Sequence, residues 1–222
     1  MDKPGTYDSS GVAERAADGS IALAEGVRLW RDKISADGQR ALIAEIFEQS
    51  GAAPFYRPTM PRSERPFSVE ETNFGPFGWY SDKHGYCYRA THPYTDQVWP
   101  PIPEALLRLW DALTLYPAPP ECCLVNLYRG DARMGPHQDR DEADLAAPVL
   151  SVSLGDSAVF RFGGVRRRDP TRAVKLSSGD VVLFGGPARL MFHGIDRVLG
   201  GSSRLVPGGG RLNLTLRRVT KT

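Results

Sequence analysis

Two histidines and one aspartate in the C-terminal half of this 222-residue chain have the types and spacing of a metal site. His137 and Asp139 are two residues apart, so on an extended segment their imidazole and carboxylate lie on the same face. His193, further along the chain, completes a set of two histidines and one carboxylate. This donor set is the facial triad of non-heme Fe(II) sites, which leaves coordination positions open. Each part alone is a weak signal, because a histidine on a strand is more often a structural hydrogen-bonding group.

Two downstream arginines strengthen the interpretation. Arg211 and Arg217 are six residues apart on an expected strand, so they share a face, and Asn213 and Thr215 lie on that face with them. An iron centre that activates oxygen needs electrons, which a metal-chelating 2-oxoacid can supply if its far carboxylate is anchored. A planar guanidinium anchors a carboxylate through two parallel charge-assisted bonds. The alternative is a basic edge strand with alternating apolar residues.

Short strands separated by turns are expected from Glu121 onward. Such a series without intervening helical patterns predicts a sandwich or jelly roll rather than a parallel α/β sheet. Asn126 and Tyr128, two apart on the first strand, can donate hydrogen bonds to the same oxoacid. The expected strands are residues 122–128, 149–154, 158–162, 181–184, 189–193 and 212–218.

Two amphipathic helices are expected upstream, at residues 35–49 and 103–113, where apolar side chains recur at helical spacing. Between them, residues 52–102 are rich in Pro, Gly and aromatic side chains, which predicts an irregular segment with short strands. Residues 1–20 are rich in Gly, Ser, Asp and Ala, which predicts a flexible end.

Composition predicts one globular domain. Hydrophobic residues make up 41% of the chain and charged residues 24%, and no apolar run approaches the roughly 20 residues that cross a bilayer. The first residues lack the order of a signal peptide, so we expect a cytoplasmic protein without a membrane anchor. The three cysteines make a disulfide framework or a zinc finger improbable, and adjacent Cys122 and Cys123 suit a buried strand.

The net charge of +2 does not by itself indicate nucleic-acid binding. The run Arg166 to Arg168 is a local basic cluster, for which a solvated face is the default explanation. Local clusters of this kind also suit contacts with a phosphate backbone.

An ordered series of motifs resembles the bacterial AlkB family of Fe(II)- and 2-oxoglutarate-dependent dioxygenases that demethylate alkylated nucleic acids. The likeness covers residues 52–219. It departs from the family pattern at Phe184, where the family has a tryptophan, and at Leu212, where the family has an aromatic residue. The motifs are Thr72-Asn73, Gly78-Trp79, Gly85-Tyr86-Cys87-Tyr88, Trp99-Pro100, Asn126-Leu127-Tyr128, His137-Gln138-Asp139-Arg140-Asp141-Glu142, Ser151-Val152-Ser153-Leu154-Gly155, Phe162-Gly163-Gly164, Gly179-Asp180-Val181-Val182, His193-Gly194-Ile195 and Arg211-Leu212-Asn213-Leu214-Thr215-Leu216-Arg217.

The resemblance implies a mainly β (α+β) fold. After the N-terminal segment 1–20, one domain at residues 21–222 would hold N-terminal helices, a nucleotide-recognition lid at 52–102 and a double-stranded β-helix (jelly-roll) core at 121–219. Its implied catalytic and iron-binding residues are His137, Asp139 and His193. Its implied 2-oxoglutarate site comprises Asn126, Leu127, Tyr128, Arg211, Leu212, Asn213, Leu214, Thr215, Leu216 and Arg217. Its implied substrate contacts are Trp79, Tyr86, Cys87, Tyr88, Asp141 and Arg167.

The implied reaction is oxidative demethylation of 1-methyladenine and 3-methylcytosine in DNA or RNA, using Fe(II), 2-oxoglutarate and O₂. An extruded base would lie between Trp79 and His193, as an out-of-stack base requires, and Asp141 would favour cationic bases. We expect a monomer that acts on single-stranded or double-stranded DNA. Two alternatives stay open: a related dioxygenase acting on tRNA or another methylated substrate, and a metal-binding jelly-roll module without turnover.

Overall fold

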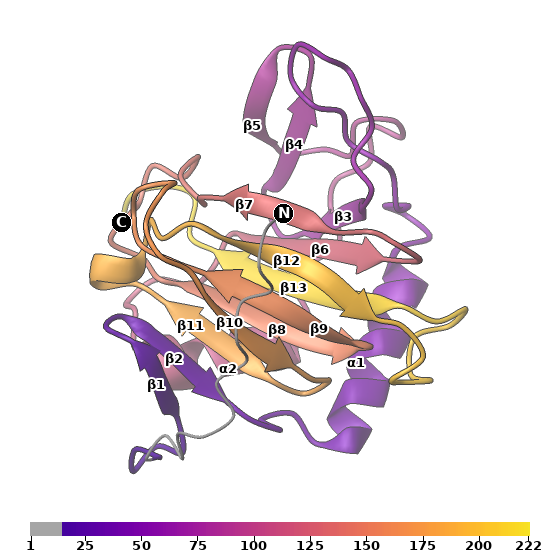
Figure 1. Ribbon diagram of the computed structural model, residues 1–222. Helices are drawn as coiled ribbons and strands as arrows, with labels where there is room; N and C mark the ends of the chain where they lie inside the picture. The colour runs from indigo at the N-terminus through magenta and orange to yellow at the C-terminus, as the bar shows by residue number, and fades with distance from the viewer. Residues whose placement is uncertain (1–14) are drawn as a thin grey trace, which may run out of the picture.

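The computed structural model describes residues 15–222 and contains two β-sheets facing each other, with a separate hairpin above them (Figure 1). The larger sheet has the strand order β1-β2-β11-β8-β13-β6-β3 and the smaller one β10-β9-β12-β7. The larger sheet comprises β1 (Ile21–Ala24), β2 (Val27–Trp30), β11 (Val181–Phe184), β8 (Val149–Gly155), β13 (Arg211–Arg217), β6 (Cys122–Tyr128) and β3 (Glu70–Phe74). The smaller sheet comprises β10 (Arg172–Leu176), β9 (Ser157–Phe162), β12 (His193–Leu199) and β7 (Met134–His137), and the hairpin β4 (Gly78–Asp82) and β5 (Gly85–Arg89).

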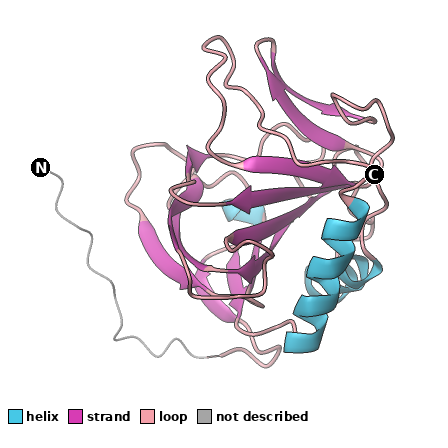
Figure 2. Cartoon of the chain, turned by 90° about the vertical axis from the view of Figure 1, so that its right-hand side faces the viewer, coloured by secondary structure: helices cyan, strands magenta, loops and turns pink. Residues whose placement is uncertain are grey.

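Both α-helices cover the outer face of the larger sheet (Figure 2). Helix α1 (Ala36–Gln49) begins where the Ser35 side chain accepts a hydrogen bond from the backbone N–H of Gly38, and α2 (Glu104–Thr114) follows Pro103. Their apolar stripes are buried against leucines and valines of the central strands, among them Leu127, Leu212, Leu214 and Leu216. Strand alternation therefore leaves the polar residues of β13 on the inner face, toward the smaller sheet.

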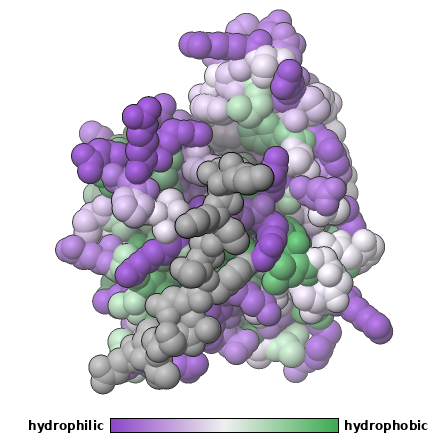
Figure 3. All heavy atoms as spheres, viewed as in Figure 1, coloured by the Kyte–Doolittle hydropathy of each residue, from purple (hydrophilic) through white to green (hydrophobic). Residues whose placement is uncertain are grey.

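A second apolar core fills part of the space between the sheets. It includes Phe160, Phe162, Leu176, Phe184 and Met191. Hydrophilic side chains cover much of the face seen in Figure 3, and more hydrophobic atoms lie at the base of the β4–β5 hairpin. No helix within residues 15–222 has the length and apolar character to span a membrane.

The predicted mainly β fold with flanking helices is confirmed, and both predicted helices begin and end within a residue of their expected bounds. One predicted strand is wrong: residues 189–193 form a turn and an extended lead-in, and the strand begins at His193. The reason is that the Arg189 side chain is buried and bonded to three neighbours, which holds the chain in a turn after the short 3-10 helix at Gly186–Ala188. Strands β1, β2 and β10 were not predicted.

Residues 15–20 form a turn in which Arg15 makes an isolated bridge to Ile21 and the Trp30 indole N–H donates to the Asp18 carbonyl. The remainder of the predicted flexible segment, residues 1–14, lies outside the described residues. The proposed division into segment, lid and β-helix core stays a prediction.

Candidate metal centre and substrate cavity

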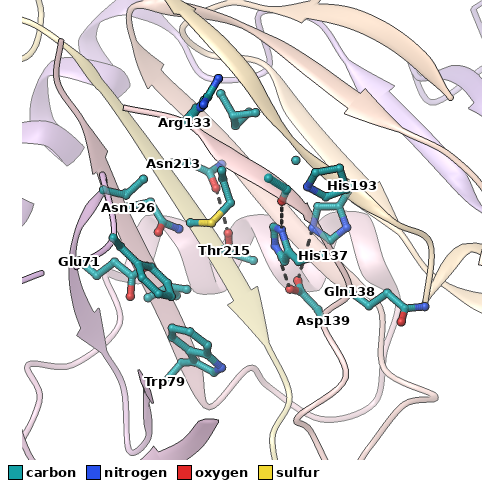
Figure 4. Close-up of a pocket in the computed structure, with 18 of the residues that line it drawn as sticks. Glu71, Trp79, Asn126, Arg133, His137, Gln138, Asp139, His193, Asn213 and Thr215 are labelled. Atoms are coloured by element: carbon teal, nitrogen blue, oxygen red, sulfur yellow. Dashed lines mark hydrogen bonds and ion pairs between the residues drawn. The ribbon is translucent and has the colours of Figure 1, made fainter. Parts of the chain in front are cut away.

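The two histidines are brought together by the pairing of β7 with β12. His193 is the register partner of His137, and their ring centroids lie 4.5 Å apart. Gly194 makes this approach possible, because a Cβ at that position would lie 2.5 Å from the Met134 carbonyl oxygen. Asp139 lies two residues beyond the end of β7 and points back toward both rings (Figure 4).

The three side chains form a compact donor set. The His137 Nε2 atom lies 3.7 Å from Asp139 Oδ1, and the His193 Nε2 atom lies 3.9 Å from Asp139 Oδ2. One ligand atom from each residue falls within 4.8 Å of the others. The predicted His-x-Asp and distant His therefore do converge in space, in an arrangement that one metal ion can bridge.

Backbone carbonyls orient both imidazoles. The His137 Nδ1 atom lies 2.9 Å from the Gly135 carbonyl oxygen, and the His193 Nδ1 atom lies 3.1 Å from that of Met191. Each Nδ1 can donate its proton to that carbonyl oxygen, which leaves the lone pair of Nε2 free to bind a metal. Burial, together with the neighbouring His137, lowers the pKa of His193 to about 4, so His193 is neutral and can bind a metal at physiological pH.

Asp139 is held as a carboxylate by two arginines. Burial alone would favour its protonated form, but Arg217 and then the two imidazoles outweigh that cost and keep the pKa of Asp139 below its usual range. The Arg217 Nη2 atom donates to Asp139 Oδ1 at 2.9 Å, and Arg189 donates to the Asp139 carbonyl oxygen. Arg189 also pairs with buried Glu142 at 2.9 Å, which fixes the loop after β7.

The donor set opens into a cavity of about 860 Å³ between the two sheets and the β4–β5 hairpin. Polar side chains of β13 and β6 form one wall, and aromatic side chains of the hairpin region form another. The polar wall includes Asn126, Tyr128, Ser151, Arg211, Asn213, Thr215 and Arg217. The aromatic wall includes Phe67, Trp79 and Tyr86.

Arg211 is fully buried at the opposite end of β13 from Arg217. Its Nη2 atom donates to the Ser153 hydroxyl at 2.8 Å, whereas its Nε atom has no hydrogen-bond partner within the described chain. Burial lowers the pKa of Arg211 to about 10, with Tyr128 and Asp180 opposing the shift, so the guanidinium is still a cation at neutral pH. The carbonyl oxygen of the Asn126 amide is likewise buried and unpartnered. The unused Arg211 Nε–H suits an anionic ligand beside the metal site, whereas the Asn126 oxygen can only accept a hydrogen bond.

The residues expected to contact substrate fall into two groups. Trp79, Tyr86, Asp141 and Arg167 line the cavity, and Trp79 stacks on Tyr86 with ring centroids 5.4 Å apart. The Trp79 indole N–H donates to Asp141 Oδ2 at 2.8 Å. Cys87 and Tyr88 are not among the lining residues: Cys87 is exposed, and the Tyr88 hydroxyl donates to Glu142.

The expected 2-oxoglutarate residues also divide. The polar members line the cavity, but the side chains of Leu127, Leu212, Leu214 and Leu216 point the other way into the helix-covered core. This corrects their inclusion as ligand contacts through side chains. Strand alternation is the cause, because neighbouring residues on β6 and β13 face opposite sides of the sheet.

Three buried charged residues near the site were not predicted: Glu71, Glu142 and Arg189. Glu142 stands in the same acidic run as Asp139, which was a usable signal. Arg189 is isolated in sequence, and Glu71 lies on a strand whose polarity resembles that of an exposed edge. Only the three-dimensional structure shows what these three residues contact.

Comparisons with known proteins agree with this geometry. The profile of the 2OG-Fe(II) oxygenase superfamily matches residues 26–217. The chain is 54% identical over 201 residues to the alpha-ketoglutarate-dependent dioxygenase AlkB homolog of Caulobacter vibrioides (strain NA1000 / CB15N), covering 90% of each chain. It is 38% identical over 203 residues to AlkB of Escherichia coli (strain K12), covering 90% of this chain and 93% of that one. The chain belongs to the AlkB family.

A solved structure shares the fold of this AlkB-family chain. The structure of OsALKBH1 superimposes with a TM-score of 0.78 at 30% identity, covering 90% of this chain and 99% of that chain. The chain is therefore an Fe(II)- and 2-oxoglutarate-dependent dioxygenase with a jelly-roll fold.

The residues present fit these cofactors. The His/Asp/His set suits Fe(II), and the unpartnered Arg211 Nε–H is a charged donor that suits a carboxylate-bearing co-substrate.

Proposed function

We propose that this chain removes methyl groups by oxidation from the N-alkylated bases 1-methyladenine and 3-methylcytosine in DNA or RNA. The observation that carries the proposal is a single cavity that joins three features: the His/Asp/His donor set, the unpartnered Arg211 and the stacked aromatic pair Trp79–Tyr86. Relatives named as AlkB dioxygenases and as DNA N(6)-methyladenine demethylases support nucleic acid as the substrate class.

At the end of the cavity that carries the His/Asp/His donor set, different residues would hold the metal and the co-substrate. His137, Asp139 and His193 would hold Fe(II), and Arg217 keeps the Asp139 carboxylate ionised and oriented. Arg211, with Asn126, Tyr128 and Asn213, would hold 2-oxoglutarate. Bound iron, 2-oxoglutarate and O₂ together supply oxidation of the methyl group, with release of formaldehyde, succinate and CO₂.

At the aromatic end, residues of the lid would receive a base removed from its stack. Trp79 offers one flat face, fixed by Tyr86 behind it and by the hydrogen bond from its indole to Asp141. His193 would contact the opposite face of the base. Single-stranded substrates are expected to be better, since unstacking a base costs less there. Arg167 lines the cavity mouth, and Arg166 and Arg168 are exposed beside it, where they would meet phosphates.

The proposed function is tested by turnover coupled to a defined lesion. Protein reconstituted with Fe(II) and 2-oxoglutarate under anaerobic conditions receives O₂ and an oligonucleotide containing one 1-methyladenine, and formaldehyde and succinate are measured. Equal release of both products supports the proposal. Succinate without formaldehyde would point to a different substrate, such as a tRNA modification, and no turnover at all would point to a binding module.

The variant His137→Ala is the control for this assay. It removes one of three metal ligands, so formaldehyde release should fall by about 1,000-fold or more, to the background without protein. Asp141→Ala should instead keep its iron and lose discrimination between bases. Equal loss of iron from both variants would contradict this division of roles.

Two further expectations belong to the proposal: a monomer and a cytoplasmic location. Size-exclusion chromatography with light scattering at assay concentrations would test the monomer, and fractionation of the producing cells would test the location.

A further inference from the structure

The carboxyl group of Glu71 is buried in the cavity wall and has no partner. Glu71 is 0% exposed, and neither carboxylate oxygen has a hydrogen-bond donor within residues 15–222. It lines the same cavity as the metal ligands and lies between Asn126 and Trp79 in Figure 4. Neither the metal site nor the expected 2-oxoglutarate site uses this group.

Strand register fixes where Glu71 lies. On β3 it is the partner of Asn126 on β6, and Asn126 is in turn the partner of Asn213 on β13. These three side chains form a row across the inner face of the larger sheet. Asn126 and Asn213 belong to the expected co-substrate site, so Glu71 extends that row by one strand toward the hairpin that carries Trp79. This is the place where the edge of a base stacked on Trp79 would lie.

Burying a carboxyl group without a hydrogen-bond partner costs free energy, unless a bound ligand supplies the partner. Burial raises the pKa of Glu71 to about 8, and the opposing effect of Arg217 is smaller. Arg217 is already committed to Asp139 at 2.9 Å. The phenols of Tyr56 and Tyr128 are the other titratable groups that respond to Glu71, and both keep their protons, because burial raises the pKa of each. Glu71 is therefore without a positive charge or hydrogen-bond donor that a bound ligand could supply.

Asp141, the acidic residue that the sequence suggested for discrimination between bases, lies in a different environment from Glu71. Asp141 is exposed, and its carboxylate accepts the hydrogen bond from the Trp79 indole. Its contact positions the aromatic wall. Glu71 is the carboxyl on the cavity wall that is both buried and free of a hydrogen bond within the described chain.

The methylated bases differ in what they would offer to Glu71. 1-Methyladenine and 3-methylcytosine are cationic and carry an exocyclic amino group next to the methylated nitrogen. 3-Methylthymine is neutral and presents a carbonyl oxygen there. A carboxylate accepts from an amino group and is stabilised by a positive ring, whereas it repels a carbonyl oxygen.

We propose that Glu71 is a specificity-determining residue, which accepts a hydrogen bond from the exocyclic amino group of a cationic methylated base and thereby selects such bases over neutral ones. This assignment rests on the proposed function. In the row of three side chains, Asn213 and Asn126 would then contact the co-substrate and Glu71 would contact the base.

The test compares Glu71→Gln with Glu70→Gln. The first variant keeps the size of the side chain and prevents it from ionising. The second changes the adjacent residue on β3, which does not line the cavity and pairs with Arg57 at 3.3 Å. Oligonucleotides of one sequence carry 1-methyladenine, 3-methylcytosine or 3-methylthymine. Formaldehyde release gives kcat/KM, and fluorescence anisotropy gives affinity for protein loaded with Mn(II) and 2-oxoglutarate without oxygen.

Glu71→Gln should lose about tenfold or more in both measurements for the two cationic bases, since hydrogen bonds to charged groups are worth this much. Binding of 3-methylthymine should stay within about twofold or improve, and Glu70→Gln should match the wild type throughout. An equal loss for cationic and neutral bases, or no loss, would overturn the assignment of Glu71 while leaving the proposed function intact. If the wild type consumes 2-oxoglutarate but neither binds nor demethylates any of the three oligonucleotides, the proposed function fails, and the assignment fails with it.

Discussion

The two ends of β13 carry the same residue in opposite states. Arg217 and Arg211 are both buried, share one face of one strand and line one cavity. Arg217 is paired with carboxylates: it donates to both carboxylate oxygens of Asp139 and lies 3.6 Å from Glu142. Arg211 has neutral partners and an unpartnered Nε. A buried cation paired with buried carboxylates stabilises the fold, and one with an unpartnered N–H is available for a ligand.

The largest effect is expected from Arg217→Met. The substitution leaves Asp139 buried without its main countercharge, which costs about 3–5 kcal/mol. The melting temperature of the metal-free protein should fall by roughly 10 °C, and turnover should be lost with it. Added Mn(II) should restore much of the stability, because the ion supplies the missing positive charge. Differential scanning fluorimetry with and without Mn(II) measures this, and an unchanged melting temperature would show that the ion pair contributes nothing.

The matched change at the other end, Arg211→Met, should act on ligand binding alone. It removes a buried charge that lacks one hydrogen bond, so the melting temperature should change by less than about 2 °C. The KM for 2-oxoglutarate should rise by roughly 30-fold or more, since the distal carboxylate loses its anchor. Iron binding should persist. If Arg211→Met destabilised the protein as much as Arg217→Met does, the contrast between the two ends would be wrong.

Glu71, like Arg211, is a buried ionisable side chain with unpartnered polar atoms within the described residues, but it is an acid. Its pKa is raised to about 8 in the folded protein, so the folded state binds more protons than the unfolded state at intermediate pH. Stability from this group is therefore fully present at pH 4 and is lost as pH rises toward 8. Between pH 5 and pH 8.5, Glu71→Gln should gain roughly 5 °C in melting temperature relative to the wild type. Because both proteins share every other titrating group, parallel melting curves across this range would show that Glu71 is not the group responsible.

The smallest effect is expected outside the cavity, at Arg168. This side chain is exposed in the basic run beside the cavity mouth. Arg168→Ser should leave stability and the turnover of a trinucleotide unchanged. For a long oligonucleotide, the slope of log affinity against log salt should fall by about 1, as expected for one phosphate contact. An unchanged slope would place the phosphates elsewhere.

The sequence by itself determined the chemistry and the short-range geometry. The alternation from Arg211 to Arg217 places side chains on one face of β13 through local strand geometry, which needs no knowledge of the fold. The His137-x-Asp139 pair indicated the donor types, although Asp139 lies beyond the end of β7 and not on the strand. The two helices follow from local periodicity for the same reason. Strands β1, β2 and β10 were missed because each is only four or five residues long, which gives too short an alternating pattern to identify.

Only the tertiary structure decided what each of these residues does. Both arginines of β13 looked alike in sequence, and it is the loop after β7 that supplies Asp139 to Arg217 and leaves Arg211 with a bond to spare. The leucines between them look equally close to the co-substrate, but pairing with β6 and cover by the helices turn them into core. In the sequence nothing distinguishes Glu71 from a solvent-exposed strand residue, and only the pairing of β3 with β6 places it in the cavity wall. Residues from distant parts of the chain decide how deeply each charged side chain is buried and which hydrogen bonds it makes. Burial and hydrogen bonding in turn decide whether a charged side chain stabilises the fold or is available to a ligand.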